Sequence, residues 1–159
     1  MATLTVTHTE SLTLNGKQLG GTNTFNITGV DMHYSRLLKT VASVDNTLVI
    51  FRAAENTADS AIAVTEAKYI RVTNLDSTNS VTLSLQISTD EDGAADDSTS
   101  ILLAAGESFV MGTPHDAIAT FINPRAATVI TTLVDLESII AHSGSNTVSL
   151  EVFVAGTEG

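Results

Sequence analysis

The chain has 159 residues, enough for one domain with a substantial hydrophobic core. It holds no cysteine, which excludes disulfides, thiolate metal sites and a cysteine nucleophile. Eighteen acidic against seven basic residues give a net charge of −11, which repels nucleic acid and anionic membrane surfaces, so neither is an expected partner. No stretch reaches the roughly 20 apolar residues of a membrane-spanning helix and the first residues lack the layout of a signal peptide, so we expect a soluble, unprocessed chain.

The N-terminal segment has the period of two that is typical of a strand. Leu4, Val6, Leu12 and Leu14 alternate with threonines, and Asn15-Gly16 then predicts a hairpin turn. Residues 20–24 are rich in Gly, Thr and Asn and predict a loop, after which Phe25 and Ile27 resume the strand pattern. We expect residues 1–30 to form an N-terminal arm, or the first strands, that pairs across a neighbouring subunit.

The middle of the chain predicts further strands. Two apolar runs between residues 37 and 51 indicate either a pair of strands or one long bent strand, and residues 52–60 fit either a loop or a short helix. The clearest hairpin is expected at residues 68–88, where Ile70 and Val72 alternate with polar partners before the loop DSTNS and Val81 alternates after it.

The last third is predicted as loops and strands. Residues 89–100 indicate an acidic loop, and residues 101–112 indicate two strands joined by a hairpin turn at Ala105-Gly106. An irregular crossing is expected around Pro114 and Pro124. Residues 127–143 also have apolar side chains at helical spacing, but their β-branched content favours strand, and we expect a terminal hairpin over 136–155.

Together these segments predict an all-β chain of eight to ten short strands with no dependable helix. That pattern is typical of a β-sandwich, which we interpret as jelly-roll-like, formed by residues 31–159 behind the extended N-terminal arm. The whole chain is expected to be a single domain.

The acidic loop is the densest group of potential ligands for a hard cation. It contains the carboxylates Asp90, Glu91, Asp92, Asp96 and Asp97, and hard cations such as calcium bind several such oxygens. Aligning Gly93 with the obligatory glycine of a helix-loop-helix calcium site, however, puts Ser88 and Thr99 where carboxylates are required. Two interpretations stay open, a solvated loop and a structural cation site.

The remaining motifs do not form a catalytic site. The four histidines, His8, His33, His115 and His142, are scattered, and His115-Asp116 after Pro114 fits a turn better than a catalytic base with its carboxylate. The run Gly106-Glu107-Ser108 lacks the closing glycine and the following helix of a nucleophile elbow. We therefore predict no catalytic, metal or cofactor residues and a chain that is not an enzyme.

Four segments carry a resemblance to a known family: TLTVTHTESLTLNGKQLGGTNTFNITGV, YIRVTNLDSTNSVTLSLQI, LLAAGESFVMG and NTVSLEVFVAG. In style and order they resemble small virion structural proteins of marine and cyanobacterial tailed phages, of the kind that decorate or cement the capsid. The resemblance implies a jelly-roll-like subunit that clusters into dimers or trimers, lies on the virion surface and binds the major capsid protein to stabilise the shell.

The expected function is therefore capsid decoration through many weak contacts that the lattice repeats. Leu4, Val6, Leu12 and Leu14 are the candidate interface residues, acting by strand pairing with another subunit or with the capsid. Two alternatives stay open: a glycan- or receptor-binding module of a tail or head fibre, and a cupin-like metalloenzyme, which would require clustered histidines in the interior of the sandwich.

Overall fold

A computed structural model describes residues 1–54, 60–88, 97–119 and 129–158. The described part of the chain holds thirteen strands and no helix, so the predicted all-β class is confirmed. In keeping with this, no described helix is long and apolar enough to cross a membrane. The first part of the predicted acidic loop, up to Asp96, lies outside the described residues. Much of the segment from 52 to 60 and the stretch around Pro124 also lie outside them.

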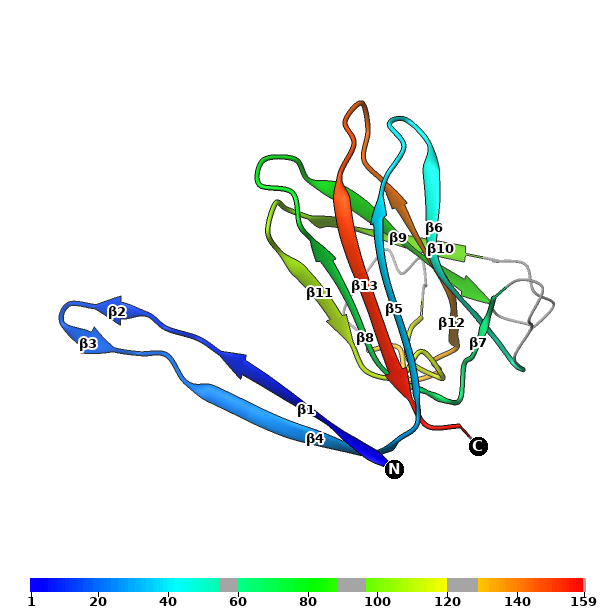
Figure 1. Ribbon diagram of the computed structural model, residues 1–159, viewed down its shortest axis with the longest axis horizontal. Coiled ribbons are helices and arrows are strands. Elements are labelled where there is room, and N and C mark those ends of the chain that lie inside the picture. The colour runs from blue at the N-terminus through cyan, green and yellow to red at the C-terminus, as the bar shows by residue number, and fades with distance from the viewer. Residues whose placement is uncertain (55–59, 89–96, 120–128, 159) are drawn as a thin grey trace.

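Nine of the strands form two sheets that pack face to face (Figure 1). One sheet has the order β10-β9-β12-β6-β7 and the other the order β11-β8-β13-β5. The predicted β-sandwich is thus confirmed. The bounds are β5 Met32–Lys39, β6 Asp45–Arg52, β7 Ile62–Ala63, β8 Ala67–Asn74, β9 Val81–Ser88, β10 Asp97–Leu103, β11 Ser108–Met111, β12 Asp135–His142 and β13 Ser149–Gly156.

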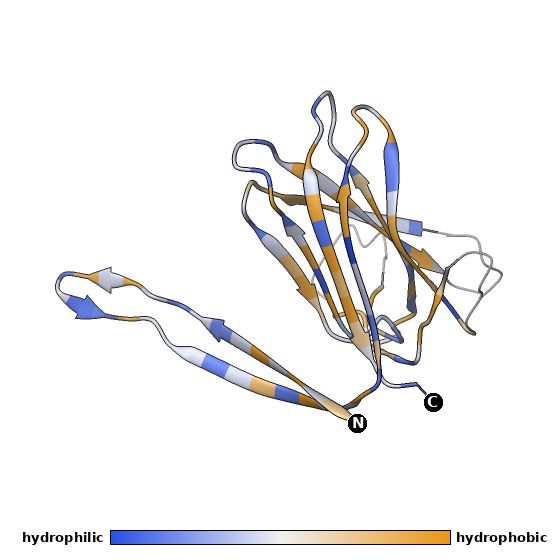
Figure 2. Cartoon of the chain, in the orientation of Figure 1, coloured by the Kyte–Doolittle hydropathy of each residue, from blue (hydrophilic) through white to orange (hydrophobic). Residues whose placement is uncertain are grey.

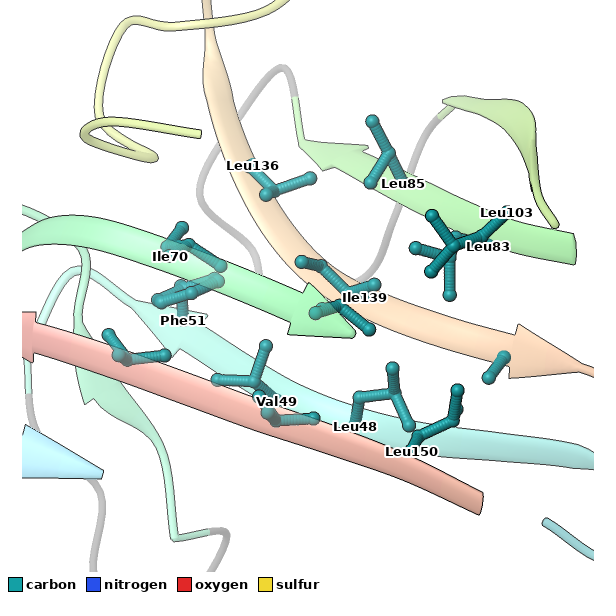
Figure 3. Packing of buried hydrophobic residues seen from close by; sticks show 14 of the residues in the cluster. Leu48, Val49, Phe51, Ile70, Leu83, Leu85, Leu103, Leu136, Ile139 and Leu150 are labelled. Atoms are coloured by element: carbon teal, nitrogen blue, oxygen red, sulfur yellow. The ribbon is translucent and has the colours of Figure 1, made fainter. Parts of the chain in front are cut away.

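The strand alternation predicted in the sequence produces the core between these two sheets. Buried side chains such as Leu83 and Ile139 come from the first sheet and pack in one cluster with Ile70 and Leu150 from the second (Figure 3). Figure 2 shows the same pattern as alternating apolar and polar bands along the strands. One face of each sheet is therefore dry, and the other face carries polar residues. The first part of the chain lies over the outer face of one of them, the sheet β11-β8-β13-β5.

The hairpin predicted over residues 68–88 is wrong. Strand β8 pairs with β11 and β13, whereas β9 pairs with β10 and β12 in the opposite sheet. Apolar and polar residues alternate in both strands because each strand buries one face. This alternation does not determine which other strand each of them pairs with. The loop between them spans the gap between the sheets, roughly 10 Å in a sandwich.

The same correction applies to two other predicted hairpins. Strands β12 and β13, expected as a terminal hairpin, lie in different sheets, and so do β10 and β11 on either side of the turn at Ala105-Gly106. The apolar runs between residues 37 and 51 fall in two strands, β5 and β6, which agrees with the first of the two predicted alternatives, and these strands also lie in different sheets. The chain therefore repeatedly crosses the core instead of turning back within one sheet.

Asn74 shows how one of these crossings is held. Its buried side chain donates toward the carbonyl oxygens of Asn79, at 2.9 Å, and Ala104, at 3.0 Å, and accepts the N–H of Asp76 at 2.9 Å. Asp76 in turn accepts the N–H groups of Thr78 and Asn79. The polar groups at this corner are thereby paired inside the protein, which fixes the path from β8 to β9.

Candidate interaction surface

The first 30 residues form one long β-hairpin, called the ribbon below, which projects from the sandwich (Figure 1). Its strands are β1 (Ala2–Thr9), β2 (Thr13–Leu14), β3 (Lys17–Gln18) and β4 (Thr22–Val30). The segment at 20–24 is therefore only partly a loop, because β4 begins at Thr22. Asn15 and Gly16, with φ of 50° and 76°, make the predicted two-residue turn at its tip.

A single register runs through most of the ribbon. Leu4 lies opposite Ile27 near the base, and Leu14 lies opposite Lys17 at the tip, so paired residue numbers add to 31 at both places. The N–H of Leu19 donates to the carbonyl of Leu12 at 2.7 Å, which carries the same register through the middle. Each side chain can therefore be assigned to one of two faces.

One face of the ribbon presents hydroxyl and amide groups. Side chains bond across the strands between Thr5 and Asn26 at 2.9 Å, Thr7 and Thr24 at 3.1 Å, and Thr13 and Gln18 at 2.9 Å. Such cross-strand pairs stabilise a ribbon without any charge. The residues on this face are Thr3, Thr5, Thr7, Thr9, Ser11, Thr13, Gln18, Thr22, Thr24, Asn26 and Thr28.

The opposite face is apolar at both ends and polar in the middle. Leu4, Val6, Phe25 and Ile27 occupy the base, and Leu12, Leu14 and Leu19 occupy the tip. Between them lie His8, Glu10 and Asn23, and the His8 ring stacks on Phe25 with centroids 6.2 Å apart. This face combines apolar clusters with one acidic and one basic residue, Glu10 and Lys17.

At its base the ribbon lies over the outer face of the sheet β11-β8-β13-β5. Leu4 and Val6 line a hollow of about 270 Å³ together with Tyr69, Arg71 and Phe153, and Val6 is only 8% exposed. A second hollow of about 340 Å³ lies beside it, between Leu4, Met32 and Phe153 among others. The base is therefore loosely packed and leaves room for further apolar side chains.

The sheet contributes a compact group of interacting side chains to this place. Arg71 Nη2 donates to Glu151 Oε2 at 2.5 Å, and its guanidinium lies 6.0 Å from the centre of the Phe153 ring. Tyr69 meets the same ring edge-on, with centroids 6.2 Å apart. Because the charge of Arg71 is balanced by Glu151, the floor of the hollow is close to neutral.

The structure separates the four predicted interface residues into two pairs. Leu4 and Val6 lie at the base beside the sandwich, whereas Leu12 and Leu14, each 54% exposed, lie at the far tip with Leu19, which is 57% exposed. Their role in contacts with another subunit or the capsid stays a prediction. Tyr69 and Phe153 were not predicted to belong to this surface, because strand alternation in β8 and β13 does not reveal that a distant ribbon approaches the outer face.

Charge is distributed unevenly between the ribbon and the sandwich. Residues 1–30 contain one Lys and one Glu, so their side chains sum to zero with histidine neutral, and the net charge of −11 lies in the rest of the chain. Edge strands are commonly protected from association by charged residues. Both edges of the ribbon are unpaired within the described residues and largely lack that protection.

The histidines do not gather in the interior of the sandwich, as the metalloenzyme alternative would require, because all four are exposed. The structure does bring Asp135 to His115, with 2.9 Å between His115 Nδ1 and Asp135 Oδ1, while Asp116 lies 3.4 Å from Nε2. Asp135 also accepts the N–H of Asp116 at 2.7 Å. Through these contacts His115, Asp116 and Asp135 connect the turn at 113–118 to the start of β12.

The comparisons with known proteins add no relative. No protein-family model matches this chain, and neither a curated protein nor a solved structure is significantly similar to it.

Proposed function

We propose that this chain is a structural protein of a phage virion that decorates the outer capsid surface, stabilises the shell and has no enzymatic activity. The ribbon carries the proposal: an element with no net charge, with exposed leucines and with edges that are unpaired within the described residues suits attachment to other proteins. The resemblance of four sequence segments to capsid decoration proteins agrees with it. The partners are the major capsid protein and further copies of the chain.

The finer fold assignment belongs to the same proposal. Numbering the eight principal strands of the sandwich from β5 to β13, without the two-residue β7, gives sheet orders 1-8-3-6 and 2-7-4-5. An eight-stranded jelly roll has two sheets made of two Greek keys, and these orders support it. Such a sandwich is a rigid platform that holds the ribbon at one end.

The mechanism is multivalent attachment. Each copy makes modest contacts, and the repeated lattice of a capsid turns them into strong avidity because a copy held by neighbours rebinds before it diffuses away. The acidic sandwich also favours a partner surface with exposed Lys or Arg. No residue is assigned a catalytic role.

The test removes residues 1–20 and measures how many copies remain on purified particles. We expect occupancy to fall strongly, whereas unchanged occupancy would show that the ribbon is not the attachment element. Immunolabelling of intact particles tests the location independently: label spread over the head supports capsid decoration, and absence of label from particles overturns the virion assignment.

A second candidate is a receptor- or glycan-binding module of a tail or head fibre. One observation favours it, namely that Phe153 is partly exposed on the outer face beside Arg71 and Glu151, and aromatic rings with flanking polar groups are typical of sugar sites. Label confined to the tail, together with saturable binding on a glycan array that Phe153→Ala abolishes, would decide for this function.

A further inference from the structure

The apolar face of the ribbon has a pattern that matches itself when reversed. From base to tip, the first strand presents Leu4, Val6, His8, Glu10, Leu12 and Leu14 on this face. Turned end to end about Thr9, the series puts Leu14 opposite Leu4, Leu12 opposite Val6 and Glu10 opposite His8. An interface with two-fold symmetry requires such self-complementarity, because residue i meets j and j meets i.

We infer that two copies of this chain join through antiparallel pairing of residues 4–14, with the two-fold axis at Thr9. The free edge of β1 in one copy pairs with the same edge in its partner, so the two ribbons form one four-stranded sheet. On the hydroxyl face this register pairs Thr5 with Thr13 and Thr7 with Ser11. Apolar side chains then lie opposite apolar ones, Glu10 lies opposite His8, and hydroxyl groups lie opposite hydroxyl groups.

The hollows at the base identify what the partner would fill. In the proposed register the partner's tip lies next to Leu4 and Val6, on the face that looks toward Phe153. The two hollows of about 340 and 270 Å³ lie at this place, and a cavity of roughly 150 Å³ already holds a benzene ring. Leucines from the tip of a second copy therefore find apolar space that the chain itself leaves open.

The same tip cannot reach these hollows within one chain. The hollows lie at the base of the ribbon, and the turn at Asn15-Gly16 lies at its far end, away from the sandwich (Figure 1). A two-stranded ribbon is also only marginally stable in water, whereas four strands with an apolar face are not so limited. The occupant that fits is a ribbon from another molecule.

Charge favours a second copy in this arrangement. The acidic sandwiches would repel one another, but the antiparallel ribbons keep them at opposite ends, and each sandwich meets only the ribbon of the other copy, whose side chains sum to zero charge. Eleven residues span about 35 Å as a strand, well beyond the Debye length of roughly 8 Å at physiological ionic strength. Repulsion between the two sandwiches is therefore largely screened.

A disulfide test reads the register directly, since the natural chain has no cysteine. With Thr9→Cys, the new thiol faces its own symmetry mate, at a separation that a disulfide can bridge. With Thr5→Cys, on the same face, the two thiols are eight residues apart along the paired strands, about 27 Å. We expect mild oxidation to cross-link T9C rapidly and T5C at least about tenfold more slowly.

The solution mass tests the leucines. Light scattering should give a dimer for the natural chain, and the double variant Leu12→Ser with Leu14→Ser should raise the dimer dissociation constant more than about a hundredfold, because four buried leucines are lost from the interface. Both side chains are exposed in the isolated subunit, so its fold should survive. The matched control is Leu102→Ser, another exposed leucine, at 68% on β10, which should leave the dimer intact.

A monomeric natural chain, a trimer, a dimer that ignores the leucine variant, or equal cross-linking of T5C and T9C would each overturn the inference. The inference names a partner for the ribbon and so rests on its proposed role in attachment. Its failure is nevertheless distinguishable from failure of the capsid proposal, because mass and cross-linking are measured on the purified chain without any particle.

Discussion

Gly20 controls the outer half of the ribbon. A Cβ added at this position would lie 1.8 Å from the carbonyl oxygen of Glu10 and 2.8 Å from the Cα of Ser11, and real Cβ contacts are essentially never below 3.0 Å. Since both neighbours are backbone atoms, a Gly20→Ala variant must separate the two strands. The bonds at risk are Glu10 N–H to Gly21 O, at 2.8 Å, and Leu19 N–H to Leu12 O, at 2.7 Å.

Each of these hydrogen bonds contributes about 0.5–1.5 kcal/mol net, so their joint loss costs roughly 1–3 kcal/mol. That is enough to unpair the outer half, because an isolated two-stranded hairpin is marginal. Amide hydrogen exchange should show that Leu19 loses its protection in the variant. The melting temperature of the sandwich should stay unchanged, because the added Cβ meets only ribbon backbone.

The control is Gly21→Ala, one residue along the same strand, where a Cβ would meet nothing within 4 Å. This variant should keep the protection of the Leu19 amide. If the Leu19 amide is equally protected in Gly20→Ala and Gly21→Ala, the close approach of the two backbones at Gly20 does not determine the pairing of the outer half, and the prediction is wrong.

Three further outcomes are expected, each measured by denaturant unfolding. Leu150→Ala removes a fully buried side chain and should cost about 2–5 kcal/mol, whereas Leu102→Ala at the surface should stay within about 0.5 kcal/mol. Asn74→Ala should cost about 1–3 kcal/mol, because the carbonyl oxygens of Leu103 and Ala104 lose their donor. Backbone N–H groups of the 76–79 turn lower the pKa of Asp76 below its ordinary 3.8. The ionised carboxylate therefore stabilises the fold above that pH, and this stabilisation is lost as the pH falls through the lowered pKa. In Asp76→Asn the free energy of unfolding should therefore decrease less steeply in acid.

The sequence predicted the strands well and their partners poorly. The alternation of Val81 and Leu83 with polar residues reports that one face of β9 is buried, and the structure bears this out. The same alternation fits a hairpin within one sheet and a crossing between two sheets equally well. What decides for a crossing here is the buried Asn74, whose bonds reach Ala104 thirty positions later, and no local pattern contains that information.

The ribbon was more predictable than the sandwich because its pairing is local. A two-residue turn at Asn15-Gly16 fixes the register of a hairpin, which places every threonine of the first strand on one face and every leucine on the other. The base is different. Whether Leu4 and Val6 are covered depends on where Tyr69 and Phe153 lie, and those residues join the ribbon only through the folded sandwich.

The choice of threonine in place of charged residues bears on what the ribbon does. A projecting hairpin that served only as a spacer could carry Lys and Glu on both faces, which would stabilise it and block association at its edges. Threonines also favour the strand conformation and form hydrogen bonds between the two strands, as Thr7 and Thr24 do at 3.1 Å. Unlike charged residues, they leave the edges of the ribbon free to pair with another strand. In a chain of net charge −11, the nearly uncharged segment of 30 residues is thus the one in which another strand can be added at the least electrostatic cost.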